Sequence, residues 1–235
     1  MLTARARRPF RRGAAITASD ILGPGDRQLP FVTFEGVEGC GKSTQLGLAA
    51  ARLRERGHRV VETREPGGTP LGERLRAVLL DPAQTNLDPV TEWLLLEADR
   101  CQHVREVLRP AVAAGAFVLC DRYSDSTEAY QQAGRGIDAE AVRLVDGLAR
   151  QGLVPDLTLL YDLDPETGLA RAGRRDGPHS GRFERAGLSF HRAVRAAYLD
   201  IARREPDRVV LLRAEADAST VFEQTWTSLQ DRLSP

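Results

Sequence analysis

The chain has 235 residues, of which 42% are hydrophobic and 28% are charged, a composition typical of a globular enzyme with one well-buried core. Its 33 basic and 33 acidic residues cancel, which argues against a protein that binds nucleic acid through overall positive charge. No apolar stretch approaches the roughly 18 residues of a membrane-spanning helix, so we expect neither a nucleic-acid partner nor a membrane partner.

Residues 1–29 differ from the remainder in composition. The opening MLTARARRPFRR is rich in arginine, and the first acidic residue is Asp20. The segment lacks the apolar middle of a secretory signal. We expect a disordered extension or residues upstream of the true start codon, with a transit-like or nucleic-acid-contacting arm as the alternative. The folded domain is then expected at 30–235.

From residue 30 onwards, short apolar runs alternate with longer helical patterns. Strands are predicted at Pro30–Glu35, Arg59–Thr63, Ala116–Cys120, Asp156–Leu163 and Arg208–Leu212. Helices are predicted at Ser43–Arg56, Leu71–Leu80, Val90–Ala114, Ala139–Gln151, Phe190–Arg204 and Thr220–Leu233. The alternation predicts an α/β fold of three layers, in which a five-stranded parallel sheet is flanked by helices. Ligands of such a sheet gather at the carboxyl ends of its strands.

The residues after the first predicted strand match the phosphate-binding pattern GxxxxGK[ST] in full. They are Gly36, Val37, Glu38, Gly39, Cys40, Gly41, Lys42 and Ser43, followed by Thr44. The pattern lies between a strand and a helix, as it must, and predicts an ATP or GTP site. Lys42 is expected to bridge the β- and γ-phosphates, and the Ser43 hydroxyl to bind Mg²⁺.

Lys42 is the only lysine in the chain, every other basic side chain being arginine. A planar guanidinium cannot replace a compact ammonium in a tight phosphate cradle, so the exception supports the site. A GTPase is excluded because its guanine-reading NKxD motif needs a second lysine.

Several further motifs follow in a fixed order. They are REPGGT at 64–69, ADRCQH at 98–103, DRYSDS at 121–126, AYQ at 129–131, GRGID at 134–138 and PDLTL at 155–159. This ordered set resembles bacterial thymidylate kinase from about Phe31 to the C-terminus. The resemblance implies the fold of P-loop nucleoside monophosphate kinases, ATP and Mg²⁺ as cofactors, dTMP as the phosphoryl acceptor, a cytoplasmic location and a homodimer.

The resemblance also implies roles near the acceptor phosphate. Glu38 would accept a hydrogen bond from the 3′-hydroxyl of dTMP. Arg76 and Arg122 would hold its phosphate, since guanidinium forks suit a dianion. Asp121 would organise Mg²⁺ through water, and Glu65 would orient nearby arginines.

Other residues are implied at the nucleoside. Arg100 and Gln131 would read the edge of the base, Thr127 would face it, and Tyr130 would cover the 2′ position of the sugar. Where the family carries a phenylalanine that stacks on thymine, this chain has Leu96. The aliphatic side chain still shields the base but lacks an aromatic contribution of roughly 0.5–1.5 kcal/mol.

The segment from Leu169 to Glu184, with four arginines and three glycines, is predicted to form a mobile lid at about 171–185. Because Gly39 stands where one subclass of the family has an arginine, the lid is expected to supply the positive charge for phosphoryl transfer. Arg175 is the first candidate, and Arg171 and Arg182 come next.

Each assignment has a structural alternative. Arg76 and Arg100 could be solvated charges on helix faces, Tyr130 an ordinary core residue, and Glu65 part of a loop salt bridge. Asp121 and Arg122 could be an ion pair at a strand end, and the lid arginines a solvated charge run. At the level of function, the alternatives are a kinase of dUMP, dCMP or a nucleoside, a non-catalytic ATP-binding module, and a nucleic-acid-associated ATPase.

Overall fold

The structure is a computed structural model that describes residues 30–176 and 181–234, except for the side chains of Arg175 and Asp176. The expectations for residues 1–29 and for the middle of the lid, 177–180, lie outside the described residues.

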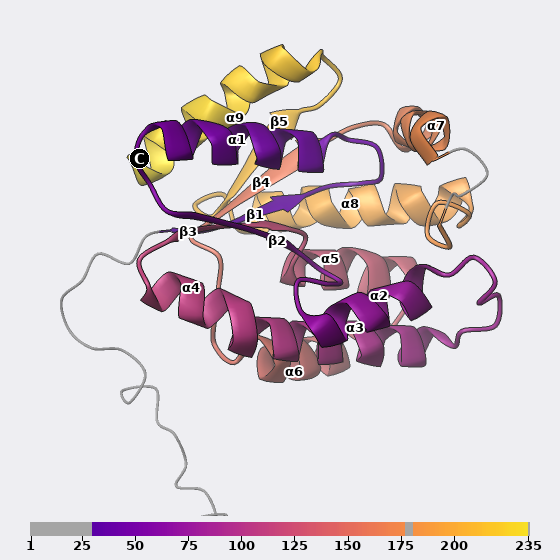
Figure 1. The fold of residues 1–235 in the computed structure, drawn as a ribbon. Coiled ribbons are helices and arrows are strands. Elements are labelled where there is room, and N and C mark those ends of the chain that lie inside the picture. Colours follow the sequence, from indigo (N-terminus) through magenta and orange to yellow (C-terminus); the bar gives the residue numbers. More distant parts are fainter. Residues whose placement is uncertain (1–29, 177–180, 235) are drawn as a thin grey trace, which may run out of the picture.

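Five strands form one parallel sheet in the order β2-β3-β1-β4-β5 (Figure 1). They are β1 (Phe31–Glu35), β2 (Val60–Arg64), β3 (Phe117–Asp121), β4 (Leu157–Asp162) and β5 (Val209–Arg213). Every neighbouring pair is parallel, and each strand overlaps the run predicted for it. The predicted α/β fold is confirmed, and the carboxyl ends of all five strands meet at one edge.

The three central strands are buried on both faces, which explains their nearly continuous apolar sequences. Side chains alternate between two apolar clusters: Val32 and Phe34 point into one, whereas Phe31 and Val118 point into the other. Between β1 and β4, the hydroxyl groups of Thr33 and Thr158 lie 2.7 Å apart, which satisfies two buried polar groups.

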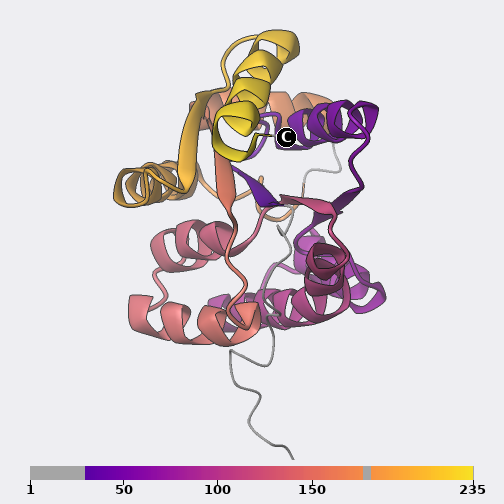
Figure 2. The same ribbon diagram turned by 90° about the vertical axis from the view of Figure 1, so that its left-hand side faces the viewer.

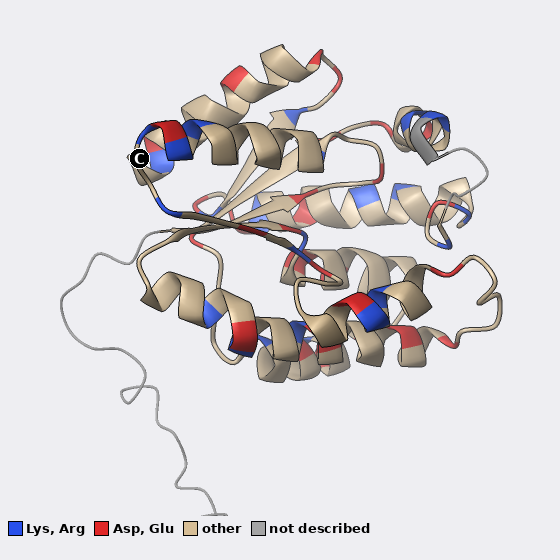
Figure 3. Cartoon of the chain, in the orientation of Figure 1, with Lys and Arg blue, Asp and Glu red and all other residues tan. Residues whose placement is uncertain are grey.

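Helices cover both faces of the sheet (Figures 1 and 2). The helical elements are α1 (Lys42–Glu55), α2 (Pro70–Leu80), α3 (Pro89–His103), η2 (Val104–Leu108), α4 (Arg109–Ala113), α5 (Ser124–Thr127), η3 (Glu128–Gly134), α6 (Ala139–Arg150), α7 (Pro165–Asp176), α8 (Leu188–Arg204) and α9 (Ala218–Leu233). Helices α1 and α9 pack together on one face, and α3 with α6 lies in the other layer. Acidic and basic positions are interspersed over both layers (Figure 3). Among the described helices, none combines the length and apolarity required to cross a bilayer.

The helix predicted at Val90–Ala114 is present, but its turns widen in the middle. Helix α3 runs without a break into the π-helical segment η2 and then into α4. Pro110 lies just beyond η2 and has no N–H to donate to the preceding turn, which accounts for a local departure from α-helical bonding.

Two helical segments were not predicted. Residues 124–134 form α5 and η3, although the helical spacing of Thr127, Tyr130 and Gln131 was a usable signal. Helix α7 extends to Asp176, so the first part of the expected lid loop is helical. Asp164 caps α7 by accepting hydrogen bonds from the N–H groups of residues 166 and 167 at 3.0 and 3.2 Å, and Pro165 opens the helix.

Helix α7 begins against the loop that follows β1. A Cβ atom built on Gly168 would overlap the carbonyl oxygen of Glu38, and one built on Gly39 would overlap the carbonyl oxygen of Gly168. Gly39 also has a φ of 69°, which favours glycine. The two backbones therefore touch, and only glycine fits at either side of the contact.

We predict that Gly168→Ala lowers the free energy of unfolding by about 1–3 kcal/mol and lowers kcat, because α7 or the loop must move to admit the methyl group. Gly173→Ala on the same helix is the matched control, since nothing lies within 4 Å of a Cβ there. Urea unfolding and steady-state kinetics of both variants would check this. Equal stabilities would show that the contact is not tight.

Candidate active site

The loop between β1 and α1 has the geometry of a phosphate cradle. Its glycines Gly36, Gly39 and Gly41 have φ angles of 139°, 69° and 93°, so the chain turns through conformations that other residues rarely adopt. The loop ends at the N-terminus of α1, where unpaired N–H groups and the helix dipole attract anions.

Lys42 folds back over this loop. Its Nζ donates to the carbonyl oxygens of Gly36 and Val37 at 3.1 and 2.9 Å and lies 3.5 Å from Cys40 Sγ. The side chain is buried, and the ammonium is therefore held at the centre of the loop rather than in solvent.

Ser43 and Asp121 face each other across the mouth of the loop. Ser43 Oγ donates to Asp121 Oδ2 at 2.5 Å, joining the first turn of α1 to the carboxyl end of β3. A hydroxyl and a carboxylate in contact beside a phosphate cradle are oxygen ligands of the kind that Mg²⁺ uses.

Arg122 adopts a left-handed backbone conformation with a φ of 72°, which is unusual for a residue with a side chain. The turn is supported by Cys120, whose thiol donates to the carbonyl oxygen of Arg122 at 3.0 Å. Arg122 Nη1 donates to the carbonyl oxygen of Gly36 at 3.0 Å, and Nη2 donates to Glu38 Oε1 at 3.1 Å. The turn thus aims the guanidinium at the phosphate-binding loop.

Glu38 is held as a carboxylate by its neighbours. Tyr130 OH donates to Oε1 at 2.6 Å, and His191 Nδ1 lies 3.2 Å from Oε2. Burial by itself raises the pKa of Glu38, but the His191 ring and the Arg122 guanidinium outweigh it and lower the pKa to about 2. His191, which was not predicted as a site residue, is buried and lies against Glu38.

A buried carboxylate that was not predicted, Glu35, supports the Arg122 turn. Its Oε1 accepts from the N–H of Tyr123 at 2.6 Å, and its Oε2 accepts from the hydroxyls of Ser126 and Tyr198 at 2.7 and 2.8 Å. Those two hydroxyls in turn accept from Arg122 Nη1 at 3.3 and 3.2 Å. Glu35 therefore holds both the backbone turn and the side chain of Arg122.

Arg76 reaches the same region from α2. Its Nη1 donates to the carbonyl oxygen of Pro66 at 2.9 Å, and no carboxylate of a described residue lies within 4.0 Å of it. Burial lowers the pKa of Arg76, and the positive charges of Arg64 and Arg122 lower it further. An anion bound here would relieve this repulsion.

Arg100 is buried among acidic groups, which rules out the alternative of a solvated helix face. Its Nε donates to Glu65 Oε2 at 2.8 Å, and its Nη1 lies within 3.0 Å of Glu97, Thr127 and Asp146. Glu65, which follows β2, forms a buried salt bridge with Arg100.

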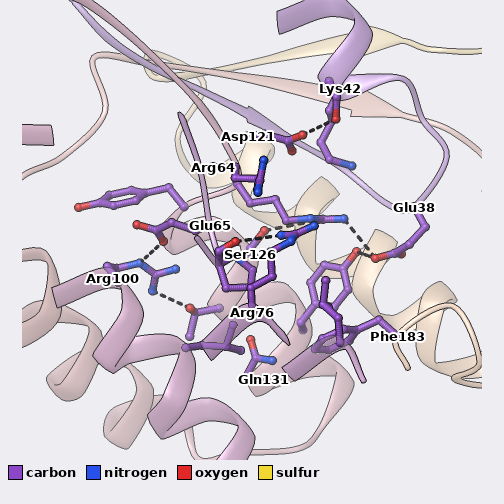
Figure 4. Close-up of a pocket in the computed structure, with 18 of the residues that line it drawn as sticks. Glu38, Lys42, Arg64, Glu65, Arg76, Arg100, Asp121, Ser126, Gln131 and Phe183 are labelled. Atoms are coloured by element: carbon purple, nitrogen blue, oxygen red, sulfur yellow. Dashed lines mark hydrogen bonds and ion pairs between the residues drawn. The ribbon is translucent and has the colours of Figure 1, made fainter. Parts of the chain in front are cut away.

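One cavity of about 450 Å³ connects these groups (Figure 4). Its lining is formed by Glu38, Gly39, Lys42, Ser43, Arg64, Glu65, Pro66, Arg76, Leu80, Leu96, Arg100, Asp121, Arg122, Tyr123, Ser126, Thr127, Tyr130, Gln131, Phe183 and Glu184. Lys42 and Asp121 lie at one end of it and Gln131 and Phe183 at the other (Figure 4). The structure thus brings the expected acceptor-side residues together with the phosphate loop in one cavity.

Phe183 also faces this cavity, beside Tyr130. The two rings pack edge to face with centroids 5.9 Å apart, so Tyr130 is a cavity wall as well as a buried aromatic. Phe183 brings an aromatic ring into a cavity whose other lining includes Leu96.

Two of the three candidate lid arginines have described side chains, and both bind groups outside the phosphate loop. Arg171 donates to the carbonyl oxygens of Ala214 and Glu215 at 3.0 and 2.9 Å. Arg182 donates to the carbonyl oxygen of Leu79 at 3.1 Å and pairs with Glu92. The side chain of Arg175, the first candidate, lies outside the described residues.

Known proteins resemble this chain over most of its length. The family model described as thymidylate kinase matches residues 34–225. The thymidylate kinase of Deinococcus radiodurans is 51% identical over 202 residues, covering 86% of this chain and 97% of that protein. That of Trichlorobacter lovleyi is 49% identical over 208 residues, covering 87% and 98%. The crystal structure of thymidylate kinase from Ehrlichia chaffeensis superposes with a TM-score of 0.71 at 31% identity, covering 86% of this chain and 98% of that one.

The Glu35 network predicts a pH dependence of stability. Burial raises the pKa of Glu35 from 4.5 to about 7, and Asp125 adds to the effect. Between these values the folded state binds more protons than the unfolded state, so stability should fall as pH rises, by up to about 1.4 kcal/mol per pH unit. Glu35→Gln should flatten this slope between pH 4.5 and 7, measured by urea unfolding, whereas Glu223→Gln on the exposed surface should retain it. An identical slope in Glu35→Gln would contradict the assignment.

Proposed function

The chain belongs to the thymidylate kinase family, and we propose that ATP, the phosphoryl donor, binds at one end of its cavity and dTMP, the acceptor, at the other. The reaction transfers the γ-phosphoryl group of ATP to dTMP and gives dTDP. The single observation that carries the division is the shared cavity, which is lined both by the phosphate loop and by Arg76, an arginine with no carboxylate of a described residue within 4.0 Å. Residues 30–235 would form one kinase domain.

At the donor end, Gly36 to Thr44 would cradle the phosphates of ATP through backbone N–H groups, and Lys42 would move from the loop carbonyls to the β- and γ-phosphates. The contact between Ser43 and Asp121 supports a Mg²⁺ site at this point. Ser43 would bind the ion directly, and Asp121 would bind it through water. The bound ion would neutralise charge on the phosphate oxygens.

At the acceptor end, Arg76 and Arg122 would hold the phosphate of dTMP so that one of its oxygens attacks the γ-phosphorus in line. The lowered pKa of Glu38 keeps it a carboxylate, which suits an acceptor of a hydrogen bond from the 3′-hydroxyl. Tyr130, held by Glu38, would cover the 2′ position. No side chain needs to act as a strong base, because the attacking phosphate is already ionised.

The base would lie farther along the cavity, between Leu96 and the side chains of Arg100, Thr127 and Gln131. Arg100 and Thr127 are already joined by a hydrogen bond of 2.7 Å. This bond supports a rigid pair of side chains along the edge of the base. Leu96 would shield one face of the base.

Charge for the transition state would come from Arg175 on α7. Arg171 and Arg182 are bound elsewhere in this structure, which supports Arg175 over them. Gly39 cannot be replaced by arginine because its Cβ position is filled by Gly168, so the phosphate loop itself leaves this charge to be supplied by another segment.

A homodimer would cover the exposed apolar side chains of α3 and α6. Leu94, Leu144 and Leu148 are 49%, 54% and 76% exposed on these two packed helices. A cytoplasmic location fits the three cysteines, which are free thiols.

We predict that Lys42→Ala abolishes phosphoryl transfer and that Arg175→Ala lowers kcat at least about tenfold with little change in the KM for dTMP, because its charge acts mainly in the transition state. A coupled ADP assay would measure both. Arg174→Ala, on the neighbouring position of α7, is the control and should lower kcat less. An unchanged kcat in Arg175→Ala would remove this residue from the mechanism.

For the homodimer, Leu148→Glu should shift the protein to monomers in sedimentation velocity, since a charge would be buried at the interface. Leu211→Glu replaces a leucine on β5 that is 48% exposed and should leave the dimer intact. A wild-type protein that sediments as a monomer at micromolar concentration would contradict the proposal.

A further inference from the structure

Glu92, in the first turn of α3, is a fully buried carboxylate for which the reaction as described has no role. Its Oε1 accepts from Gln131 Nε2 at 3.1 Å. Arg135 donates to Oε1 from Nε at 3.1 Å and to Oε2 from Nη2 at 3.0 Å, and Arg182 Nη2 lies 2.5 Å from Oε2. Two guanidinium groups therefore compensate the buried charge of Glu92.

This arrangement fixes which way the amide of Gln131 faces. An ionised carboxylate only accepts hydrogen bonds, so it must meet the NH₂ side of the amide and would repel the carbonyl oxygen. Because the nitrogen and oxygen of an amide lie on opposite sides of its carbon, the oxygen turns away from Glu92. Figure 4 shows it directed towards the interior of the cavity.

A carbonyl oxygen at this point distinguishes pyrimidines by the chemistry of ring position 3. Thymine and uracil carry an N–H there and can donate to the oxygen, whereas cytosine presents a lone pair that the oxygen repels. A site built to bond one partner rejects an analogue that leaves its polar group unpaired.

We propose that Glu92 is a specificity-determining positioning residue, which holds the Gln131 amide so that the cavity accepts a base with an N–H at position 3 and rejects cytosine. The inference rests on the proposed role of Gln131 in reading the base. Glu92 itself would touch no substrate and would act only through that amide.

The test compares kcat/KM for dTMP, dUMP and dCMP in the full-length enzyme. Glu92→Gln can donate as well as accept, so the Gln131 amide becomes free to turn over. We expect the ratio of kcat/KM for dTMP over dCMP to fall about tenfold, chiefly through a higher KM for dTMP. The ratio of dTMP over dUMP should not change, since both bases carry the N–H. Glu223→Gln is the matched control and should leave both ratios unchanged.

Two further variants separate the possible failures. In the Gln131→Ala background, Glu92→Gln should have no additional effect on the dTMP over dCMP ratio, as expected when one residue acts through the other. If Gln131→Ala lowers the ratio but Glu92→Gln does not, the positioning role is overturned while the proposed base contact stands. If Gln131→Ala leaves the ratio unchanged, the base contact fails and the inference fails with it.

A crystal structure of the wild-type enzyme with dTMP provides a check that needs no variant. Gln131 Oε1 should lie within hydrogen-bonding distance of the pyrimidine N3, with Nε2 still on Glu92. A Gln131 side chain that has left Glu92 in this complex would overturn the proposal.

Discussion

The hydrogen bond from Arg122 to the carbonyl oxygen of Gly36 joins the two halves of the cavity. It is possible because β1 and β3 are neighbours, so the loops that follow them leave the sheet side by side. The left-handed turn at Arg122 then directs the guanidinium back across the loop, and Glu35 holds that turn from beneath. The relative placement of the proposed donor and acceptor sites would therefore be set by strand order and by one buried carboxylate.

The balance of charge around the arginines differs between the two ends of the cavity, as the proposed ligands would require. Around Arg100, acidic side chains already neutralise the guanidinium, which leaves a fixed polar surface suited to an uncharged base. Within the described part of the chain, the hydrogen-bond partner of Arg76 is the carbonyl oxygen of Pro66, and burial together with the positive charge of Arg64 lowers the pKa of Arg76. Arginine would thus have two roles in the cavity, contact with the base and contact with a phosphate, and the carboxylates around each arginine would determine its role.

The fold was largely predictable because strands buried on both faces leave long apolar runs, and the phosphate loop was predictable because its residues are contiguous. Glu35 and Glu92 were not found, since their partners lie far away in the sequence and neither belongs to a local pattern. Helix α7 was missed because its glycines and arginines suggested a loop, although Asp164 and Pro165 form a recognisable start. Roles at the nucleoside depended on the ordered motifs rather than on any single residue.

The contact between Gly39 and Gly168 has an evolutionary consequence. A kinase that carries its transition-state arginine in the phosphate loop needs a side chain where the backbone of α7 lies in this protein. The change from one arrangement to the other cannot proceed by a single substitution at position 39, because the helix would have to retreat first. As long as α7 lies against the loop, an arginine at position 39 has no space for its side chain, and the proposed charge would have to come from another segment.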